Sequence, residues 1–308
     1  MKVKTVRIAT RKSPLALWQA EHVKKCLLDV HPDLEVELVG MTTEGDRFLE
    51  APLIEVGGKG LFIKELEQAI LEQRADIAVH SMKDVTIDMP VGFVLPIIME
   101  RESTHDVLVS NKYKSIAEIP DGGVIGTSSL RRQSQIRALR PDIQIRDLRG
   151  NVGTRLGKLD DGQYDAIILA AAGIKRLGLA DRIAQLIPHE EILPAIGQGA
   201  IGIECREDDT EVHALLAALN HEDTRLCVEA ERSLSRRLYG GCQLPIAGQA
   251  VLDGDKLSLS GLVARVDGTE IVKSSLEGDR SEGDKLGIEL GERLLGNGAD
   301  EILREILN

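Results

Sequence analysis

A cysteine follows two glycines in the stretch LYGGCQLPIAG, residues 238–248 of this 308-residue chain. Gly240 and Gly241 precede Cys242, and a proline follows three residues later, so the pattern predicts a turn that presents the thiol. The alternative is a small residue of the core. The other cysteines lie in helix-like or strand-like stretches without the spacing of a zinc site and are expected in the core: Cys26, Cys205 and Cys227.

Basic and hydroxyl-bearing residues recur where a predicted strand ends and the next helix begins, the edge at which α/β sheets bind ligands. Between residues 131 and 158 there are eight lysines or arginines and two aspartates, in a chain of formal net charge −12. Arginines and helix N-termini favour anions, so the pattern predicts a site for several anionic groups. Taken singly, these residues could be helix caps or solvated surface groups. They are Thr10 to Ser13, Ser81 to Asp84, Thr127 to Arg132, Arg149 to Arg155, and Lys175 with Arg176.

Asp84 is the only acid in the stretch HSMKDV. Among basic residues its carboxylate is expected to stay ionised, and it could stabilise a cation or transfer a proton. The alternative is a structural aspartate that balances the charge of Lys83 or of an arginine. The sequence leaves both interpretations open.

The stretch EVGGKGLF places a lysine in a glycine-rich loop. The phosphate-binding pattern GxxxxGK[ST] is absent, because Leu61 follows Gly60. The loop is therefore interpreted as a lid that brings Lys59 to the site. An ordinary surface loop is the alternative.

Alternating strand-like and helix-like stretches must position these residues. Up to about residue 220 the alternation predicts a mainly parallel sheet with helices on both faces. Beyond that point a long helix leads to three strand-like runs separated by DGD and DGT, a strong signal for hairpins. A final amphipathic helix is expected over residues 282–307. The sequence thus predicts an α/β body followed by a small α+β domain with an antiparallel sheet.

The composition excludes several functional classes. Hydrophobic residues make up 43% of the chain and charged residues 29%, as in soluble globular proteins. Aromatic residues make up only 2%, too few for stacking along single-stranded nucleic acid. The net negative charge disfavours binding to nucleic acid or to anionic membranes. No export signal or membrane span is recognisable, so a cytoplasmic protein is expected.

Eight motifs together give the chain its resemblance to a known family. They are RIATRKSPLALWQA, GGKGLF, ADIAVHSMKD, GTSSLRRQ, RGNVGTRL, DAIILAAAGIKRLG, LPAIGQGAIGIE and GGCQLPI. In this order the sequence resembles porphobilinogen deaminase, also called hydroxymethylbilane synthase, over essentially its whole length. One departure is Thr86, where the family commonly has proline. The resemblance implies a transferase of heme and tetrapyrrole biosynthesis that joins four porphobilinogen molecules head to tail, with loss of ammonia. The chain grows on a covalent dipyrromethane primer, and hydrolysis releases hydroxymethylbilane.

The resemblance also implies a role for each motif residue. Cys242 would carry the dipyrromethane cofactor through a thioether, with Gly240 and Gly241 letting its loop reach the cleft, and Asp84 would be the catalytic carboxylate. The carboxylates on every pyrrole would explain the many basic residues. Cofactor binding is expected from Lys83, Thr127, Ser129, Arg131, Arg132 and Gly150. Substrate binding is expected from Arg11, Ser13, Arg149, Arg155 and Arg176, with Lys59 on the lid and no metal.

The resemblance implies three domains. Residues 1–99 with 200–217 and residues 100–199 would form doubly wound α/β domains like those of periplasmic binding proteins, with the active cleft between them. Residues 218–308 would form the small α+β domain with a three-stranded antiparallel sheet and the cysteine. A monomer is expected. The main alternative is a two-lobed protein that binds small anions without catalysis; it would normally carry an export signal and would not need Cys242. An effector-binding regulator is less favoured, because no helix-turn-helix precedes the body.

Overall fold

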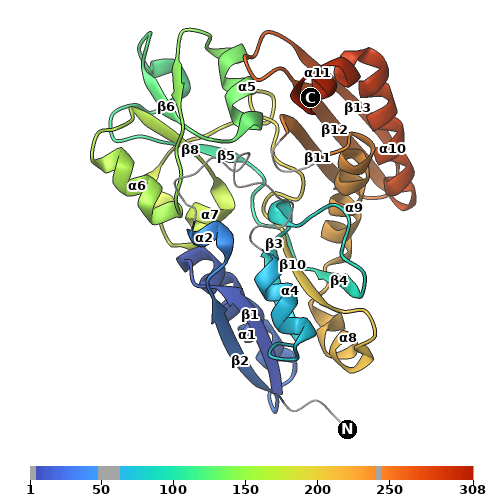
Figure 1. Cartoon of the computed structure of the whole chain (residues 1–308). Helices are drawn as coiled ribbons and strands as arrows, with labels where there is room; N and C mark the ends of the chain where they lie inside the picture. Colours follow the sequence, from blue (N-terminus) through green and yellow to red (C-terminus); the bar gives the residue numbers. More distant parts are fainter. Residues whose placement is uncertain (1–4, 48–62, 241–243, 308) are drawn as a thin grey trace. The chain divides into compact units, whose positions relative to one another are not determined.

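The computed structural model of the chain describes residues 5–47, 63–240 and 244–307 (Figure 1). The chain divides into two compact units, one of residues 1–102 with 200–225 and the other of residues 103–199 with 226–308. Each unit holds a five-stranded sheet with helices, and the second also holds a three-stranded antiparallel sheet near the C-terminus. The expected fold class is confirmed. The division into three domains stays a prediction.

The sheet of the first unit has the strand order β2-β1-β3-β10-β4. β1 is parallel to β2 and β3, whereas β10 is antiparallel to its neighbours β3 and β4. Because β10 is antiparallel to both neighbours, β4 runs in the same direction as β1, β2 and β3. The expectation of a mainly parallel sheet therefore holds except at β10, which comes from a distant part of the chain and enters in the opposite direction. The strands are β1 Thr5–Arg11, β2 Glu35–Met41, β3 Ile77–Ser81, β4 Phe93–Ile98 and β10 Ile201–Arg206.

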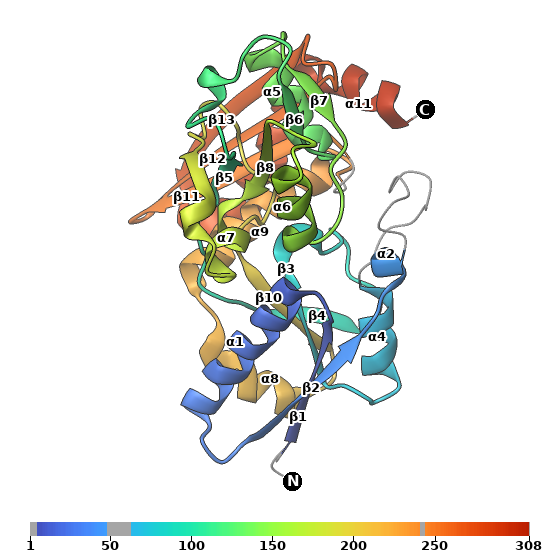
Figure 2. The same cartoon turned by 90° about the vertical axis from the view of Figure 1, so that its left-hand side faces the viewer.

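Helices cover both faces of this sheet (Figure 2). α1 packs on one face, where its Val23 and Leu27 share a core with Ile8 of β1. α4 packs on the other face, where its Ile70 shares a core with Ala9. Neighbouring residues of a strand point to opposite faces, so one short apolar strand serves both cores. The helices are α1 Pro14–Val30, α2 Glu44–Arg47, α4 Lys64–Leu71 and α8 Thr210–Leu216.

The five-stranded sheet of the second unit has the order β7-β6-β8-β5-β9 and is also mixed. β6 is parallel to β7 and β8, while β5 is antiparallel to β8 and β9. α5 packs on one face through Ile136, and α6 packs on the other through Leu156 and Leu159. The elements are β5 Asp106–Val109, β6 Val124–Gly126, α5 Leu130–Leu139, β7 Gln144–Arg146, α6 Val152–Asp160, β8 Ala166–Ala170, α7 Ala171–Arg176 and β9 Ile183–Leu186.

The C-terminal part pairs β11, β12 and β13 in sequence order, all antiparallel. The DGD signal marks the first hairpin, where Gly254 takes a φ of 60°. α10 packs along the sheet, and its Leu286 and Leu290 enter the core there (Figure 1). The elements are α9 Glu222–Arg237, β11 Ile246–Asp253, β12 Lys256–Ala264, β13 Ile271–Asp279, α10 Gly283–Leu294 and α11 Asp300–Leu307.

The final helix is interrupted, contrary to the expectation of one continuous helix. A π-helical turn, Leu295–Ala299, separates α10 from α11. Gly298 there has a φ of 109°, a left-handed conformation that ends the regular helix and that glycine adopts readily. In the described part of the chain, no helix is both long enough and apolar enough to cross a membrane.

Candidate functional site

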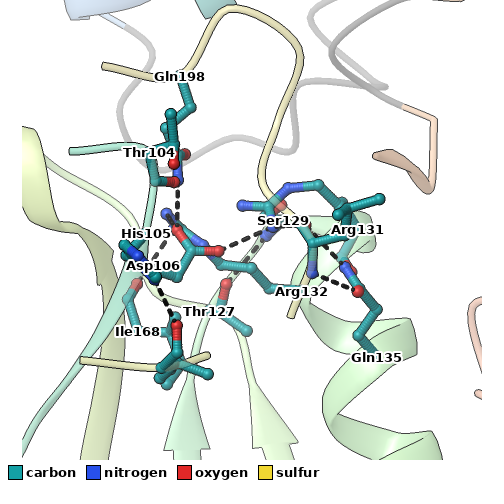
Figure 3. Close-up of polar contacts among 12 residues, drawn as sticks. Thr104, His105, Asp106, Thr127, Ser129, Arg131, Arg132, Gln135, Ile168 and Gln198 are labelled. Carbon is teal, nitrogen blue, oxygen red and sulfur yellow. Dashed lines mark hydrogen bonds and ion pairs between the residues drawn. The ribbon is translucent and has the colours of Figure 1, made fainter. Parts of the chain in front are cut away.

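A buried carboxylate between two arginines is the centre of the polar cluster in the second unit (Figure 3). Asp106 Oδ2 lies 2.8 Å from Arg131 Nη1, and Asp106 Oδ1 lies 2.7 Å from Arg132 Nη2. Asp106 is fully buried, and the two arginines are 4% and 6% exposed. The two arginines that the sequence predicts as anion-binding residues therefore share one internal partner.

The elements around the cluster explain its position. Asp106 is the first residue of β5, where it pairs with Ala170 of β8. The arginines stand in the first turn of α5, which follows β6 through Thr127 to Ser129. Thr127 Oγ1 accepts a hydrogen bond from the backbone N–H of Ser129 at 3.2 Å. Ser129 is the N-cap of α5, but its hydroxyl makes no capping hydrogen bond, which leaves it available to a ligand.

Further hydrogen bonds fix the arginine side chains. Arg131 Nη1 donates to the carbonyl oxygen of Leu193 at 2.7 Å, and Arg132 Nη1 donates to that of Ile168 at 3.1 Å. Gln198 Nε2 donates to Asp106 Oδ1 at 3.0 Å. Each guanidinium is thus held by a carboxylate and by a backbone carbonyl, which fixes its orientation as well as its position.

The charges of the cluster leave it suited to an anion. Burial is the strongest influence on Asp106 and raises its pKa, but the charges and hydrogen bonds of Arg131 and Arg132 together hold the pKa well below its usual range. One negative and two positive charges give the cluster a net charge of +1. Among the described residues, the buried Nε of Arg132 has no hydrogen-bond partner. A carboxylate-bearing ligand would supply both the negative charge and the acceptor.

A second basic group surrounds the N-terminus of α6. Gly150 has a φ of 112°, and a Cβ there would lie 2.7 Å from Thr154 Cγ2, so only glycine fits without strain. The carbonyl oxygen of Gly150 accepts a hydrogen bond from Arg155 Nε at 2.7 Å. Arg149 is half-buried just before it, and Arg176 Nη2 donates to the carbonyl oxygen of Gly199 at 2.7 Å.

Parallel pairing brings the predicted residues of the second unit to one edge of its sheet. β7 and β8 both run parallel to β6, so the carboxyl ends of these three strands meet at the same edge. The residues that follow them are Thr127 to Arg132, Arg149 to Arg155, and Arg176. The rule that α/β sheets bind ligands at the carboxyl ends of their strands thus selected, from the sequence, residues of three separate stretches that lie at the same edge of the sheet.

In the first unit, the predicted residues follow the parallel strands β1 and β3. Arg11 ends β1, and Ser13 Oγ caps α1 by accepting a hydrogen bond from the backbone N–H of Ala16 at 3.4 Å. Lys83 and Asp84 lie in the 3₁₀ turn Met82–Asp84 directly after β3. Ser13 thus has at least a structural role, whatever else it binds.

The Asp84 side chain is exposed, and no hydrogen bond or ion pair joins it to another described residue. The turn that carries it is anchored by the backbone N–H of Met82, which donates to the carbonyl oxygen of Ala200 on the way into β10 at 3.0 Å. The alternative interpretation, in which Asp84 balances the charge of a neighbouring basic residue, is therefore not supported by any ion pair within the described ranges. The carboxylate is open to a ligand.

Two predicted residues, Cys242 and Lys59, lie outside the described residues, as does Gly241. Gly240 is described: its N–H donates to the carbonyl oxygen of Ser235 at 2.8 Å, and a Cβ on it would lie 2.2 Å from Ser235 Oγ. Its lack of a side chain is thus required by the end of α9.

The remaining cysteines lie in or against the core. Cys205 and Cys227 are buried, and Cys26 packs against the core while half-buried. Burial raises the pKa of Cys205 to about 12, and it also raises the pKa of Cys26. These thiols are therefore poor nucleophiles.

Sequence reasoning missed Asp106 and Gln198. Asp106 opens the apolar run DVLV, which indicates only the start of a strand, and Gln198 stands in the glycine-rich stretch AIGQGA. The available signal was Asp106 itself, a charged residue at the first position of a strand that is otherwise apolar. This signal indicates that the Asp106 side chain would be buried, but it does not indicate which groups would contact it.

Comparison with known proteins identifies the family. Residues 6–214 match the model "Porphobilinogen deaminase, dipyromethane cofactor binding domain", and residues 225–296 match "Porphobilinogen deaminase, C-terminal domain". Among solved structures, a putative methionine-binding lipoprotein from Bacillus subtilis is similar with a TM-score of 0.44 at 14% identity, over 72% of this chain and 92% of that chain. The periplasmic aliphatic sulphonate binding protein SsuA from Escherichia coli gives a TM-score of 0.42 at 16% identity, over 76% and 70%.

The first family model covers most of both sheets with the arginine cluster and Asp84, and the second covers the antiparallel sheet with α9 and α10. The chain therefore belongs to the porphobilinogen deaminase family, the transferases that polymerise porphobilinogen in tetrapyrrole synthesis.

Proposed function

We propose that this enzyme carries its dipyrromethane cofactor on Cys242 and binds the cofactor carboxylates through Arg131 and Arg132. The observation that supports this most directly is the buried cluster of net charge +1, in which Arg132 Nε has no partner among the described residues. A cofactor carboxylate would complete the hydrogen bonding and the charge balance there. Lys83, Thr127, Ser129 and Gly150 would complete the cofactor site.

Attachment to Cys242 is a single substitution at the aminomethyl carbon of porphobilinogen. The thiol sulfur bonds to that carbon, the carbon–nitrogen bond breaks, and the thiol proton leaves with the amine as ammonia. A second porphobilinogen then loses ammonia in the same way, as the free α-carbon of the first ring bonds to its aminomethyl carbon and gives up its proton, which completes the dipyrromethane. A thioether is stable, so the cysteine need react only once. When bound, the dipyrromethane supplies the primer to which porphobilinogen units are added.

The remaining basic residues are proposed to hold substrate carboxylates. Every porphobilinogen carries an acetate and a propionate, so each added unit brings further negative charge. The orientation of Arg155 by Gly150 and of Arg176 by Gly199 supports directed binding. The proposed set is Arg11, Ser13, Arg149, Arg155 and Arg176, with Lys59 on a lid.

Asp84 is proposed to be the catalytic carboxylate. Loss of ammonia and attack by a pyrrole both place positive charge on pyrrole nitrogens, and the attacking ring then loses a proton. An exposed carboxylate without an ion pair to a described residue can stabilise that charge and accept that proton.

The proposal also includes a cytoplasmic monomer of three domains. The rival is a protein that binds small anions reversibly. It would need the basic residues but neither a covalent adduct nor Asp84.

Intact mass tests the proposal. Purified wild-type protein should be heavier than its sequence by one dipyrromethane, and Cys242→Ser should have the plain sequence mass and no activity. Cys26→Ser is the matched control, since Cys26 is half-buried against the core, and it should keep the adduct. Active wild-type protein at plain sequence mass would exclude the covalent cofactor, and an adduct retained in Cys242→Ser would move the attachment elsewhere.

A further inference from the structure

The two arginines of the cluster are neighbours on one helix, yet both reach the same carboxylate. Consecutive residues of an α-helix project about 100° apart, so Arg131 and Arg132 do not share a direction by helix geometry. In Figure 3 they approach Asp106 from the same helix, and one carboxylate oxygen lies 2.8 Å from Arg131 while the other lies 2.7 Å from Arg132. Asp106 is what brings their guanidinium groups together.

Asp106 is itself held firmly. Its backbone stands in β5, paired with Ala170 on one side, and its carbonyl oxygen accepts a hydrogen bond from the N–H of Ile187 at 3.0 Å on the other. Gln198 Nε2 donates to Oδ1, and the same amide nitrogen donates to the carbonyl oxygen of Thr104 at 2.6 Å. The carboxylate therefore belongs to the rigid sheet and not to a loop.

Asp106 also sets the charge that a ligand meets. Without it, two buried guanidinium groups would repel each other at the start of α5. With it, one unit of positive charge remains for the carboxylates of a ligand.

We propose that Asp106 is a positioning residue for cofactor binding, which fixes both guanidinium groups in the geometry that receives the cofactor. This inference rests on the proposed function of Arg131 and Arg132. Asp106 does not touch the cofactor in this proposal; it acts through the arginines alone.

The test compares Asp106→Asn with Asp76→Asn. Asp76 is also a mostly buried carboxylate paired with an arginine, since its Oδ1 lies 2.7 Å from Arg7 Nη2 in the first unit. Apoprotein of the wild type and of each variant is incubated with porphobilinogen, and intact mass follows the gain of the adduct. Thermal unfolding is recorded on the same samples.

Asp106→Asn should load at least about tenfold more slowly than the wild type, by analogy with the roughly 10–100-fold losses seen when a residue that orients a metal ligand is removed. Asp76→Asn should load at the wild-type rate even if its thermal stability falls as much as that of Asp106→Asn. Loading of Asp106→Asn at the wild-type rate, or equal slowing in both variants, would overturn the inference. Wild-type protein that never gains an adduct would instead refute the proposed function, so the two failures are distinguishable.

Asp106→Glu keeps the test decisive if Asp106→Asn does not fold. This variant retains the charge but moves the carboxylate by one methylene group. Positioning predicts slow loading in folded Asp106→Glu, whereas a role in charge balance alone predicts loading at the wild-type rate.

Discussion

Replacing Arg132 by methionine should destabilise the second unit measurably at neutral pH. Methionine keeps much of the aliphatic stem but leaves the fully buried carboxylate of Asp106 with Arg131 as its one cationic partner among the described residues. Breaking a buried ion pair typically costs 3–5 kcal/mol, and the retained Arg131 argues for the lower end, about 3 kcal/mol. At roughly 2–4 °C per kcal/mol for a domain of this size, the melting temperature should fall by roughly 6–12 °C.

The loss should also depend on pH in a defined direction. In the wild type the pKa of Asp106 is lower in the folded protein than in the unfolded chain. The ionised carboxylate therefore stabilises the fold above about pH 4, and this stabilisation is lost as the pH falls through the folded pKa. Removing Arg132 removes one charge and one hydrogen bond that lower this pKa, while burial continues to raise it. As the pH falls through the raised pKa, protonation of Asp106 relieves the penalty in the variant. The difference in melting temperature should therefore shrink on acidification.

Thermal unfolding of apoprotein at about pH 7.5 and about pH 5 measures both effects without interference from the cofactor. Arg182→Met is the control, because Arg182 pairs with the exposed Asp160 at 2.6 Å in the same unit, and such a surface pair contributes less than about 1 kcal/mol. A melting temperature unchanged in Arg132→Met, or a difference that stays constant between the two pH values, would refute the account of Asp106 as a buried charge balanced by two arginines.

Two further substitutions test the proposed roles of Asp84 and Gly150. Asp84→Asn should lower single-turnover ammonia release from cofactor-loaded enzyme at least about 100-fold, because it removes both the charge and the basicity of the side chain. Asp88→Asn, at an exposed aspartate nearby, should leave the rate of ammonia release unchanged. A loss below about tenfold in Asp84→Asn would leave Asp84 a minor role. Gly150→Ala should cost about 1–3 kcal/mol in thermal unfolding and slow elongation, since its Cβ would lie 2.7 Å from Thr154 at a φ of 112°. Gly162→Ala has a φ of 75° but open space around the Cβ and should cost less; equal losses would show that the contact with Thr154 is unimportant.

Local patterns in the sequence predicted much of the fold. The Asp-Gly signals marked the hairpins of the C-terminal sheet, and Ser13 with Pro14 marked the start of α1. Strand direction was not predictable, because an apolar run such as that of β10 has the same composition whether it enters a sheet in parallel or antiparallel. The break at Gly298 was missed because the amphipathic pattern continues across it.

The site shows the same division between local and distant information. Arg131, Arg149 and Asp84 follow strand ends in the sequence itself, so the rule for α/β sheets located them. Asp106 was not located, because its significance comes from two arginines at least 25 residues away in the sequence, and no local pattern records such a pairing. The proposed covalent attachment to Cys242 rests on the sequence resemblance and not on any contact among the described residues.

The place of β10 has a consequence for synthesis on the ribosome. β10 lies between β3 and β4, yet the segment from β5 to β9 separates it from them in the chain. At 5–20 residues per second, the roughly 100 residues between β4 and β10 take about 5–20 s to translate. During that interval the nascent first unit has β1, β2 and β3 but lacks the strand that joins β4 to them, so β3 presents an open edge that could pair with another chain. The five-stranded sheet whose synthesis starts first is thus completed after the five-stranded sheet of the second unit, whose last strand ends at Leu186, and the cell must tolerate an unfinished sheet until residue 206 has emerged.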